Sequence, residues 1–380
     1  MRILQVSSAR AFGGGERHLV DLARSLAGRG HEVYAAIQPD SALREHLLAA
    51  LPRNNIYELP LRNLRDARGS IKLARFAHSN KVDIMHAHVA RDYWAAFLAA
   101  PSRRTHSGPR VVLTRHVLFP LGVASRYLLS HAARVIAVSE AVARSLRTQG
   151  ISDSEKIRVV TNGVDLRRFE EARAAFEREM SERGTTQRPL RVGIVGELSE
   201  VKNQEDFVRA AALVADEFGS SVEFLIVGDE LARSGVYGVR LERLISELRL
   251  TESVRIVRRC EDVAPLIASL DVLVSASRSE AFGMVMAEAA ACGVPVVATA
   301  TEGAREIVSD GSTGLIVPIG DVSALASAVA SLLRDEGLRR KLGSNALEVA
   351  RERFSLERMV TETERVYAEA LGIETIADIE

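Results

Sequence analysis

The stretch DVLVSASRSEAFGMVMAEAAACGVPVVAT, residues 271–299, carries the pattern on which the fold prediction rests. It begins with the β-branched run DVLVSAS and passes through a polar turn into a helical segment from about Met284 to Ala291. It ends with a second β-branched run, VPVVAT. Parallel strands are covered on both faces, so their sequences are nearly continuous apolar runs. The stretch therefore predicts a strand, a helix and a further strand of one parallel sheet.

The same alternation runs through the whole chain. The apolar runs of the first half are RILQVSS, HEVYAAI, NIYELP, VDIMHAH, RVVLTR, RVIAVS and IRVVTN. Those of the second half are LRVGIVG, VEFLIVG, VRIVR, DVLVSAS, VPVVAT and GLIVP. Helical patterns such as ERHLVDLARSLAGRG separate them, with apolar residues at spacings of three and four. This alternation predicts two doubly wound α/β domains.

The chain length also favours two domains, because 380 residues are too many for one hydrophobic core. We place the first domain at residues 1–170 and the second at residues 171–352. A helical segment over residues 353–380 follows the last strand, and we expect it to pack back on the first domain.

The composition is that of an ordinary globular protein, with 47% apolar, 26% charged and 5% aromatic residues. It excludes a disordered chain, a collagen-like repeat and a coiled-coil rod. No uninterrupted apolar run reaches the about 18 residues of a membrane-spanning helix, and the N-terminal stretch lacks the pattern of a secretory signal. Two cysteines, Cys260 and Cys292, are too few for a disulfide framework. We expect a cytoplasmic protein.

The net charge of zero conceals an asymmetry. Residues 1–168 contain 26 Lys and Arg against 13 Asp and Glu, and all nine histidines lie there. A basic half suggests an anionic partner, such as a phosphorylated acceptor, a lipid surface or a nucleic acid, although two oppositely charged halves can also simply attract each other. The segment over residues 112–134 mixes basic and apolar residues, as in helices on anionic lipid. Peripheral contact with the inner face of a membrane is therefore one interpretation, and a core helix with surface arginines is the other.

In an open parallel sheet, ligands bind beyond the carboxyl ends of the strands. The stretch Gly13–Glu16 follows the first strand and opens a helix, where glycines permit close backbone approach and the helix N-terminus favours an anion. His86 and His88 follow the fourth strand, but no nearby carboxylate or cysteine completes a metal set, so packing or hydrogen bonding is favoured. His116, after the fifth strand, is the better functional candidate, since imidazole can donate to a sugar hydroxyl or a phosphate.

The second half has charged residues at corresponding positions. Lys202 stands near the start of a helix that follows LRVGIVG, a suitable place to hold a diphosphate. Glu280 follows a strand, Phe282 and Gly283 form a turn, and Glu288 lies one turn into the next helix. Carboxylates hydrogen-bond vicinal hydroxyls, and the amides of the helix N-terminus suit an anion, so this neighbourhood favours a sugar on either side of a diphosphate.

Residues 280–288 resemble the E-x7-E motif of the retaining glycosyltransferases of family 4, and EAFGMVMAEAAACGVPVVAT is similar almost position for position. The resemblance covers nearly the whole chain. It includes the following stretches: Gly13–Glu16, His86–His88, His116, Asn162–Asp165 with Phe169, Gly196–Asn203 and Asp310–Pro318. It implies the GT-B architecture, two Rossmann-like domains facing a cleft.

The resemblance also implies a function: metal-independent transfer of a hexose-type sugar from a nucleoside diphosphate sugar to an acceptor hydroxyl, in glycan, glycolipid or cell-surface polysaccharide synthesis. It implies no cofactor, no metal and no nucleic-acid partner. The implied catalytic residues are His116, Lys202 and Glu280. The implied donor-binding residues are Gly14, Gly15, Arg258, Phe282, Gly283, Met284 and Glu288.

One position departs from the family pattern. The family has arginine after the Val-Gly of the donor loop, whereas this chain has Glu197. A carboxylate repels a diphosphate unless it turns away or binds a cation. Two alternatives to a transferase stay open, a non-hydrolysing sugar-nucleotide 2-epimerase and a non-catalytic sugar-nucleotide sensor. A dehydrogenase is disfavoured, because the dinucleotide-binding glycine spacing is missing.

Overall fold

The computed structural model describes residues 1–61, 67–100, 108–151, 154–182, 188–230, 235–258, 260 and 262–373. The chain divides into two compact units. Unit 1 comprises Met1–Gly163 and Leu356–Glu380, and unit 2 comprises Val164–Ser355. The last residues of the helical segment expected at residues 353–380 lie outside the described part.

Unit 1 is built on a seven-stranded parallel sheet with the order β3-β2-β1-β4-β5-β6-β7. The strands are β1 (Arg2–Ser7), β2 (Glu32–Ile37), β3 (Ile56–Glu58), β4 (Ile84–Ala87), β5 (Arg110–Arg115), β6 (Arg134–Ala137) and β7 (Ile157–Val159). Consecutive residues of the central strands are buried, which shows that both faces of the sheet are covered.

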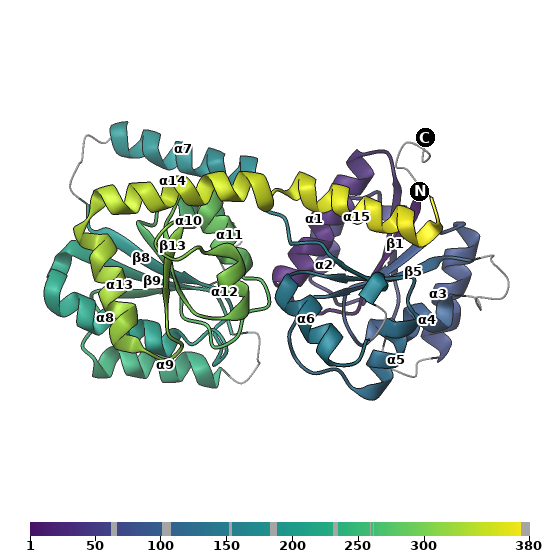
Figure 1. Ribbon diagram of the computed structural model, residues 1–380, viewed down its shortest axis with the longest axis horizontal. Helices are drawn as coiled ribbons and strands as arrows, with labels where there is room; N and C mark the ends of the chain where they lie inside the picture. The colour runs from purple at the N-terminus through teal and green to yellow at the C-terminus, as the bar shows by residue number, and fades with distance from the viewer. Residues whose placement is uncertain are drawn as a thin grey trace. The chain divides into compact units, whose positions relative to one another are not determined.

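The helices of unit 1 come mainly from the segments between its strands. They are α1 (Gly14–Gly28), α2 (Leu43–Leu48), α3 (Ala67–Ser79), α4 (Asp92–Ala99), α5 (Val123–His131), α6 (Glu140–Thr148) and α15 (Leu356–Leu371), with short 3₁₀ turns at Arg53–Asn55 and Ser154–Lys156. The last of these, α15, returns from the end of the chain and runs beside α1 (Figure 1). Glu364 of α15 accepts hydrogen bonds from Arg29 at 2.5 Å and from His31 at 2.9 Å, and Tyr367 is fully buried in the core of the unit.

Unit 2 is built on a six-stranded parallel sheet with the order β10-β9-β8-β11-β12-β13. The strands are β8 (Leu190–Val195), β9 (Val222–Val227), β10 (Val254–Val257), β11 (Val272–Ser275), β12 (Val296–Thr299) and β13 (Gly314–Val317). The helices are α7 (Leu166–Glu182), α8 (Gln204–Phe218), α9 (Val236–Glu247), α10 (Ala264–Ala268), α11 (Met284–Ala291), α12 (Glu302–Ile307), α13 (Val322–Arg334) and α14 (Glu336–Arg353), with a 3₁₀ turn at Gly219–Ser221. Each apolar run quoted above contains one strand, so the prediction of two doubly wound parallel sheets is confirmed.

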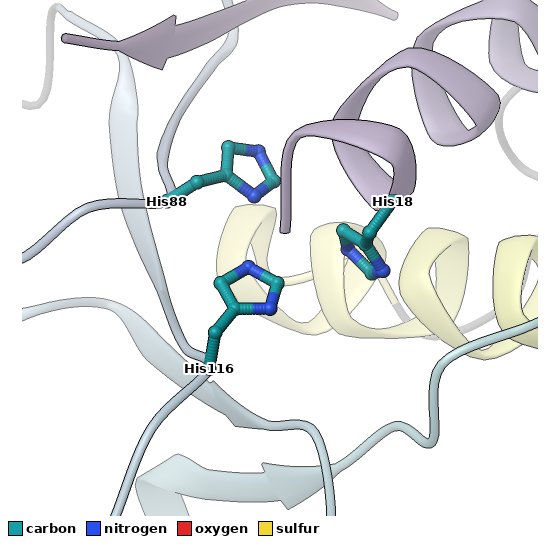
Figure 2. A group of neighbouring side chains, drawn as sticks. All are labelled: His18, His88 and His116. Atoms are coloured by element: carbon teal, nitrogen blue, oxygen red, sulfur yellow. The ribbon is translucent and has the colours of Figure 1, made fainter. Parts of the chain in front are cut away.

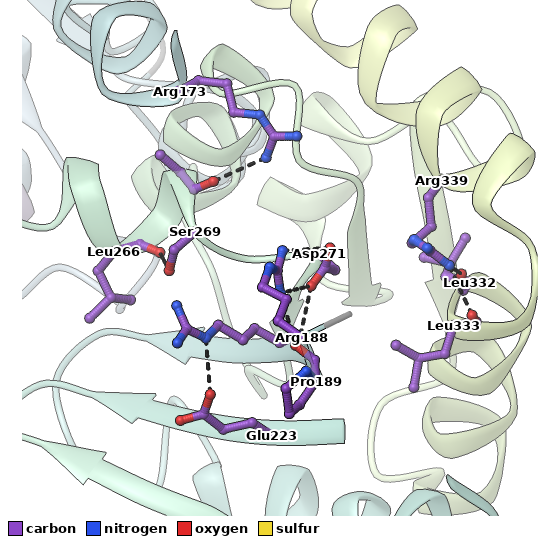
Figure 3. A network of polar contacts seen from close by, with 12 residues as sticks. Arg173, Arg188, Pro189, Glu223, Leu266, Ser269, Asp271, Leu332, Leu333 and Arg339 are labelled. Atoms are coloured by element: carbon purple, nitrogen blue, oxygen red, sulfur yellow. Dashed lines mark hydrogen bonds and ion pairs between the residues drawn. The ribbon is translucent and has the colours of Figure 1, made fainter. Parts of the chain in front are cut away.

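Helix α7 lies wholly in unit 2, whereas we placed the domain boundary at residue 170, inside this helix. Tertiary contacts explain its position. Arg173 donates to the carbonyl of Ala268 at the end of α10 (3.0 Å), and Glu170 pairs with Arg351 of α14 at 2.8 Å. Figure 3 shows the first of these contacts beside the bidentate pair of Arg188 and Asp271, which joins the starts of β8 and β11.

Both sheets reverse their winding at one place. In unit 1 the chain moves outward from β1 to β2 and β3, and β4 then returns to the other side of β1. In unit 2, β11 returns to the other side of β8 in the same way. Loops that leave adjacent strands at such a switch point diverge and leave a crevice at the carboxyl edge of the sheet, which is where ligands bind in this class of fold.

Candidate functional site

The switch point of unit 2 brings together two of the predicted site residues, although they lie far apart in the sequence. Lys202 belongs to the loop after β8 and Glu280 to the loop after β11, and Lys202 Nζ donates to Glu280 Oε2 at 2.6 Å. Ser277 Oγ donates to the same carboxylate oxygen at 3.2 Å. The side chain of Lys202 is 27% exposed and that of Glu280 is 13% exposed. The ion pair is therefore partly shielded from water but still open to a ligand.

The loop that carries Lys202 is held by close backbone packing at its start. Gly196 donates to the carbonyl of Val227 at 2.9 Å. Gly228 has a φ of +142°, and a Cβ atom there would lie 2.0 Å from the carbonyl oxygen of Gly196, so only glycine fits. The side chain of Gln204 spans the loop, donating to the carbonyl of Glu197 at 2.8 Å. These contacts fix the direction in which the loop presents Lys202.

Glu197, the residue that departs from the family pattern, lies in this same loop. Partial burial raises the pKa of Glu197, the positive charge of Lys202 lowers it, and the negative charge of Glu230 raises it further. The electrostatic influence of Lys202 places the two side chains in one neighbourhood. The carboxylate of Glu197 is therefore part of the electrostatic surroundings of the Lys202–Glu280 pair.

The turn before α11 is the second tightly packed element of this site. Gly283 has a φ of +97°, and a Cβ atom there would lie 3.2 Å from Glu280 Cγ and 2.1 Å from Met286 Cε. Gly303 donates to the carbonyl of Glu280 at 3.0 Å, which locks the turn against the start of α12. The ring of Phe282 is buried with its centroid 5.7 Å from that of Phe354, so this residue can offer a ligand only its backbone.

The other predicted residues of unit 2 lie in different surroundings. Met284 is the first, partly buried residue of α11, and Glu288 is buried one turn later with 6% of its surface exposed. Arg258 is exposed at the end of β10, where its guanidinium donates to Glu242 Oε1 at 2.8 Å. Since β9 lies between β8 and β10, Arg258 is two strands away from Lys202 in the sheet.

The switch point of unit 1 carries the glycine stretch and His116. Gly13 is the N-cap of α1, and its amide donates to Glu16 Oε2 at 3.1 Å, while burial raises the pKa of Glu16. Gly14 and Gly15 form the first positions of the helix. A Cβ atom on Gly15 would lie 3.8 Å from His116 Cγ, so the glycine stretch and His116 are direct neighbours.

Three further histidines surround His116. His18 of α1 and His88 after β4 have ring centroids 4.9 and 5.8 Å from that of His116, and Figure 2 shows the three rings turned toward one another. The ring centroid of His86 lies 4.1 Å from that of His88, and His86 hydrogen-bonds to Tyr367 Oη at 2.7 Å and to Thr114 Oγ1 at 2.6 Å.

Burial determines the charge state of all four rings. It lowers the pKa of His18 to about 4 and holds the pKa values of His86, His88 and His116 well below the usual value for histidine. The rings are therefore neutral at pH 7. The hydrogen-bonding role predicted for His86 agrees with its two contacts, and His18 was missed because nothing in its sequence context shows that α1 faces the ends of β4 and β5.

Comparison with known proteins identifies the activity. Residues 12–168 match the family described as Glycosyltransferase Family 4, and residues 176–349 match the family described as Glycosyl transferases group 1. The chain is a glycosyltransferase. The two matching segments of this glycosyltransferase lie almost entirely in unit 1 and unit 2, respectively.

Curated relatives of this glycosyltransferase match along most of their length. It is 27% identical to N-acetyl-alpha-D-glucosaminyl L-malate synthase of Bacillus anthracis, over 92% of each chain. It is 29% identical to D-inositol 3-phosphate glycosyltransferase of Paenarthrobacter aurescens, over 95% of this chain and 94% of the relative.

Solved structures agree on the fold. A glycosyltransferase from Rickettsia africae superposes with a TM-score of 0.84 at 24% identity, covering 97% of this chain and 98% of the other. The Anabaena protein HepE, solved in complex with UDP-glucose, has a TM-score of 0.82 at 25% identity, covering 97% of this chain and 100% of HepE. The predicted GT-B architecture, with its two Rossmann-like domains, is thereby confirmed.

Proposed function

We propose that this glycosyltransferase moves a hexose-type sugar from a nucleoside diphosphate sugar to an acceptor hydroxyl, with retention of the anomeric configuration and without a divalent metal in the chemical step. The observation that carries the proposal is the Lys202–Glu280 pair at the switch point of unit 2, directly before the N-terminus of α11. A cation and helix amides side by side suit a diphosphate, and the adjacent carboxylate suits a sugar hydroxyl.

The roles follow from the charge that develops in the reaction. Breaking the bond between the sugar and the phosphate builds positive charge at the anomeric carbon and negative charge on the diphosphate. Lys202 and the backbone amides of residues 282–284 stabilise that negative charge, which is electrostatic catalysis at a preorganised site. Glu280 holds hydroxyls of the donor sugar, and Glu288 holds those of the ribose.

Three residues of unit 1 and one of unit 2 complete the assignment. His116 contacts the donor sugar as a neutral imidazole, and the backbone at Gly14 and Gly15 approaches the diphosphate. Arg258 serves the nucleobase, which requires it to leave Glu242 or to extend beyond it.

Retention without a protein nucleophile is consistent with attack on the same face from which the diphosphate leaves. The acceptor oxygen forms its bond to the anomeric carbon as the bond to the phosphate oxygen breaks. The proton of the acceptor hydroxyl passes to the departing phosphate oxygen, so the atoms and charges balance. Glu280 is not assigned as a nucleophile, because its carboxylate is hydrogen-bonded by Lys202 and Ser277.

For the acceptor, we propose a small anionic hydroxyl compound. The names of the two curated relatives contain L-malate and inositol 3-phosphate, both of which carry negative charge. The first 168 residues have twice as many basic as acidic residues, which suits an anionic acceptor. A lipid-linked acceptor stays the second candidate, since Phe119, Val123 and Tyr127 are exposed apolar residues of the basic segment 112–134. Among the described residues, no helix has the length and apolar character to cross a membrane.

The proposal is tested with UDP, GDP, ADP and TDP and their glucose and N-acetylglucosamine conjugates. A nucleotide at a hundred times its Kd stabilises the folded chain by about 2.7 kcal/mol, which is visible as a higher Tm. Release of the nucleoside diphosphate is then followed with L-malate, inositol 3-phosphate or no acceptor. Acceptor-dependent release supports a transferase. Conversion of the sugar nucleotide to its 2-epimer, without net release of the nucleoside diphosphate, supports the epimerase. Binding without either reaction supports the sensor.

A further inference from the structure

His18, His88 and His116 each contribute one ring nitrogen to a compact group. Within the described part of the chain, these three nitrogens lie within 4.8 Å of one another. They come from three different elements: α1, the loop after β4 and the loop after β5. The group therefore depends on the folded topology of unit 1 and not on a local sequence motif.

Each of the three rings also has a buried nitrogen without a hydrogen bond of normal geometry among the described residues, although the Asn162 side chain lies close enough to His18 to offset part of the pKa lowering caused by burial. These atoms are His18 Nδ1, His88 Nδ1 and His116 Nε2. The side chains of His18 and His88 are almost wholly buried, with 3% and 5% of the residue surface exposed. An unpaired buried polar atom costs about 1–3 kcal/mol, so three in one place point to a missing common partner.

The hydrogen bonds of His88 leave its unpaired nitrogen as a lone-pair donor. His88 Nε2 lies 2.7 Å from Gln5 Oε1, and because an amide oxygen only accepts, Nε2 carries the proton. Nδ1 is then the unprotonated nitrogen that faces the group. A second contact holds Gln5 in this orientation, since its amide donates to Tyr367 Oη at 3.3 Å. A hydrogen-bonded second nitrogen is the usual support of a metal-ligating histidine.

We infer that His18, His88 and His116 form a binding site for a divalent transition-metal ion, with zinc as the representative. Neutral imidazole is the ligand that zinc, cobalt, nickel and copper share, and three histidines with one open position make a common zinc site. Zinc–nitrogen bonds of about 2.1 Å require each ring nitrogen to move inward by less than about 1 Å, which side-chain rotation provides. His116 is the only partly exposed member of the three and gives the ion its route from solvent.

Occupancy of this site has a consequence that rests on the proposed function. His116 is assigned there as a donor-sugar contact, and a metal ion bound to His116 Nε2 occupies one of its two ring nitrogens and fixes the ring, which competes with that contact. Zinc is therefore expected to inhibit transfer without taking part in it.

The experiment uses the full chain without a polyhistidine tag, first stripped with EDTA. Zinc content is measured after incubation with excess zinc and gel filtration, and cobalt binding is followed by its visible absorption, which is intense for four-coordinate sites. The variants are His18→Gln and His88→Gln. The glutamine amide at position 88 can still donate to Gln5, but it lacks the inward-facing nitrogen. His46→Gln, at an exposed histidine, is the matched control.

We expect about one zinc per chain in the parent protein and in His46→Gln, and at least a tenfold weaker affinity in both site variants. Absence of zinc from the parent protein overturns the inference and assigns the three nitrogens to a bridging water. Equal uptake by the parent protein and the two variants overturns it as well. Circular dichroism and the metal-free Tm establish that each variant is folded, and a variant that fails is replaced by His116→Gln. Metal content is independent of turnover, so failure of the proposed function leaves this test intact.

Discussion

The contact between Lys202 and Glu280 makes a quantitative prediction about diphosphate binding. Lys202 Nζ is 2.6 Å from Glu280 Oε2, and a diphosphate has to draw the ammonium group away from that carboxylate. A hydrogen bond to a charged group contributes about 1.5–3 kcal/mol when it replaces water. Lys202→Met removes this contribution, so the Kd for UDP, or for whichever nucleoside diphosphate the screen selects, should rise about 10- to 150-fold. Titration calorimetry measures the change, with Lys341→Met at an exposed lysine of the same unit as control.

Glu280→Gln should lower the Kd for UDP, whereas Lys202→Met should raise it. The amide keeps the shape of the side chain but no longer holds Lys202 by charge, and a partly exposed ion pair is worth up to about 1 kcal/mol. UDP should therefore bind up to about fivefold more tightly, while sugar transfer falls because the carboxylate no longer holds the sugar. The reasoning is refuted if Lys202→Met leaves the Kd within twofold of the parent value. It is also refuted if Glu280→Gln weakens UDP binding as much as Lys202→Met does.

Three further predictions concern single residues. Glu197→Arg reverses a charge beside the diphosphate site and should tighten UDP binding by about 1 kcal/mol, about fivefold; weaker binding in the same titration would contradict this. Gly228→Ala should lower the free energy of unfolding in urea by more than about 2 kcal/mol, because its Cβ atom would lie 2.0 Å from the Gly196 carbonyl oxygen. An unchanged urea midpoint would show that the backbones of Gly196 and Gly228 are not in such close contact. Burial raises the pKa of Asp92 from 3.8 to about 6, so the folded state keeps a proton that the unfolded chain has lost. The free energy of unfolding of the parent protein should therefore fall by about 3 kcal/mol as the pH rises from about 4 to about 6, and Asp92→Asn should not show this fall. If urea unfolding gives the same pH dependence for both proteins, the pKa assigned to Asp92 is wrong.

The fold could be predicted because its signal is local and repeated. A parallel strand covered on both faces has to be a continuous apolar run, and β11 and β12 lie within the runs DVLVSAS and VPVVAT. The helix predicted from about Met284 to Ala291 begins and ends at those residues. The position of α7 was less predictable, because its charged sequence is helical in either domain and only its contacts with α10 and α14 assign it to unit 2.

The candidate site could be predicted only in part. Strand ends are visible in the sequence, so Lys202 and Glu280 could be selected one at a time. Their hydrogen bond depends on β8 and β11 being neighbours, which the order of strands in the chain does not reveal. His18 illustrates the same limit, since it reaches His88 and His116 only because α1 begins at the switch point between β1 and β4.

The two switch points differ in electrostatic character, and under the proposed function this difference suits them to different tasks. Unit 2 presents a partly exposed ion pair, Lys202 and Glu280. Because the pair is partly exposed, Lys202 can leave the Glu280 carboxylate for an incoming diphosphate at little desolvation cost. Unit 1 presents neutral, buried imidazoles that lie beside the backbone of Gly15. The neutral rings bring no positive charge to a diphosphate, but they can discriminate among hydroxyl groups or ligate a metal ion. Under the proposed function, we therefore expect unit 2 to supply the charge that holds the diphosphate, and His116 to affect which sugar is accepted and whether zinc inhibits transfer.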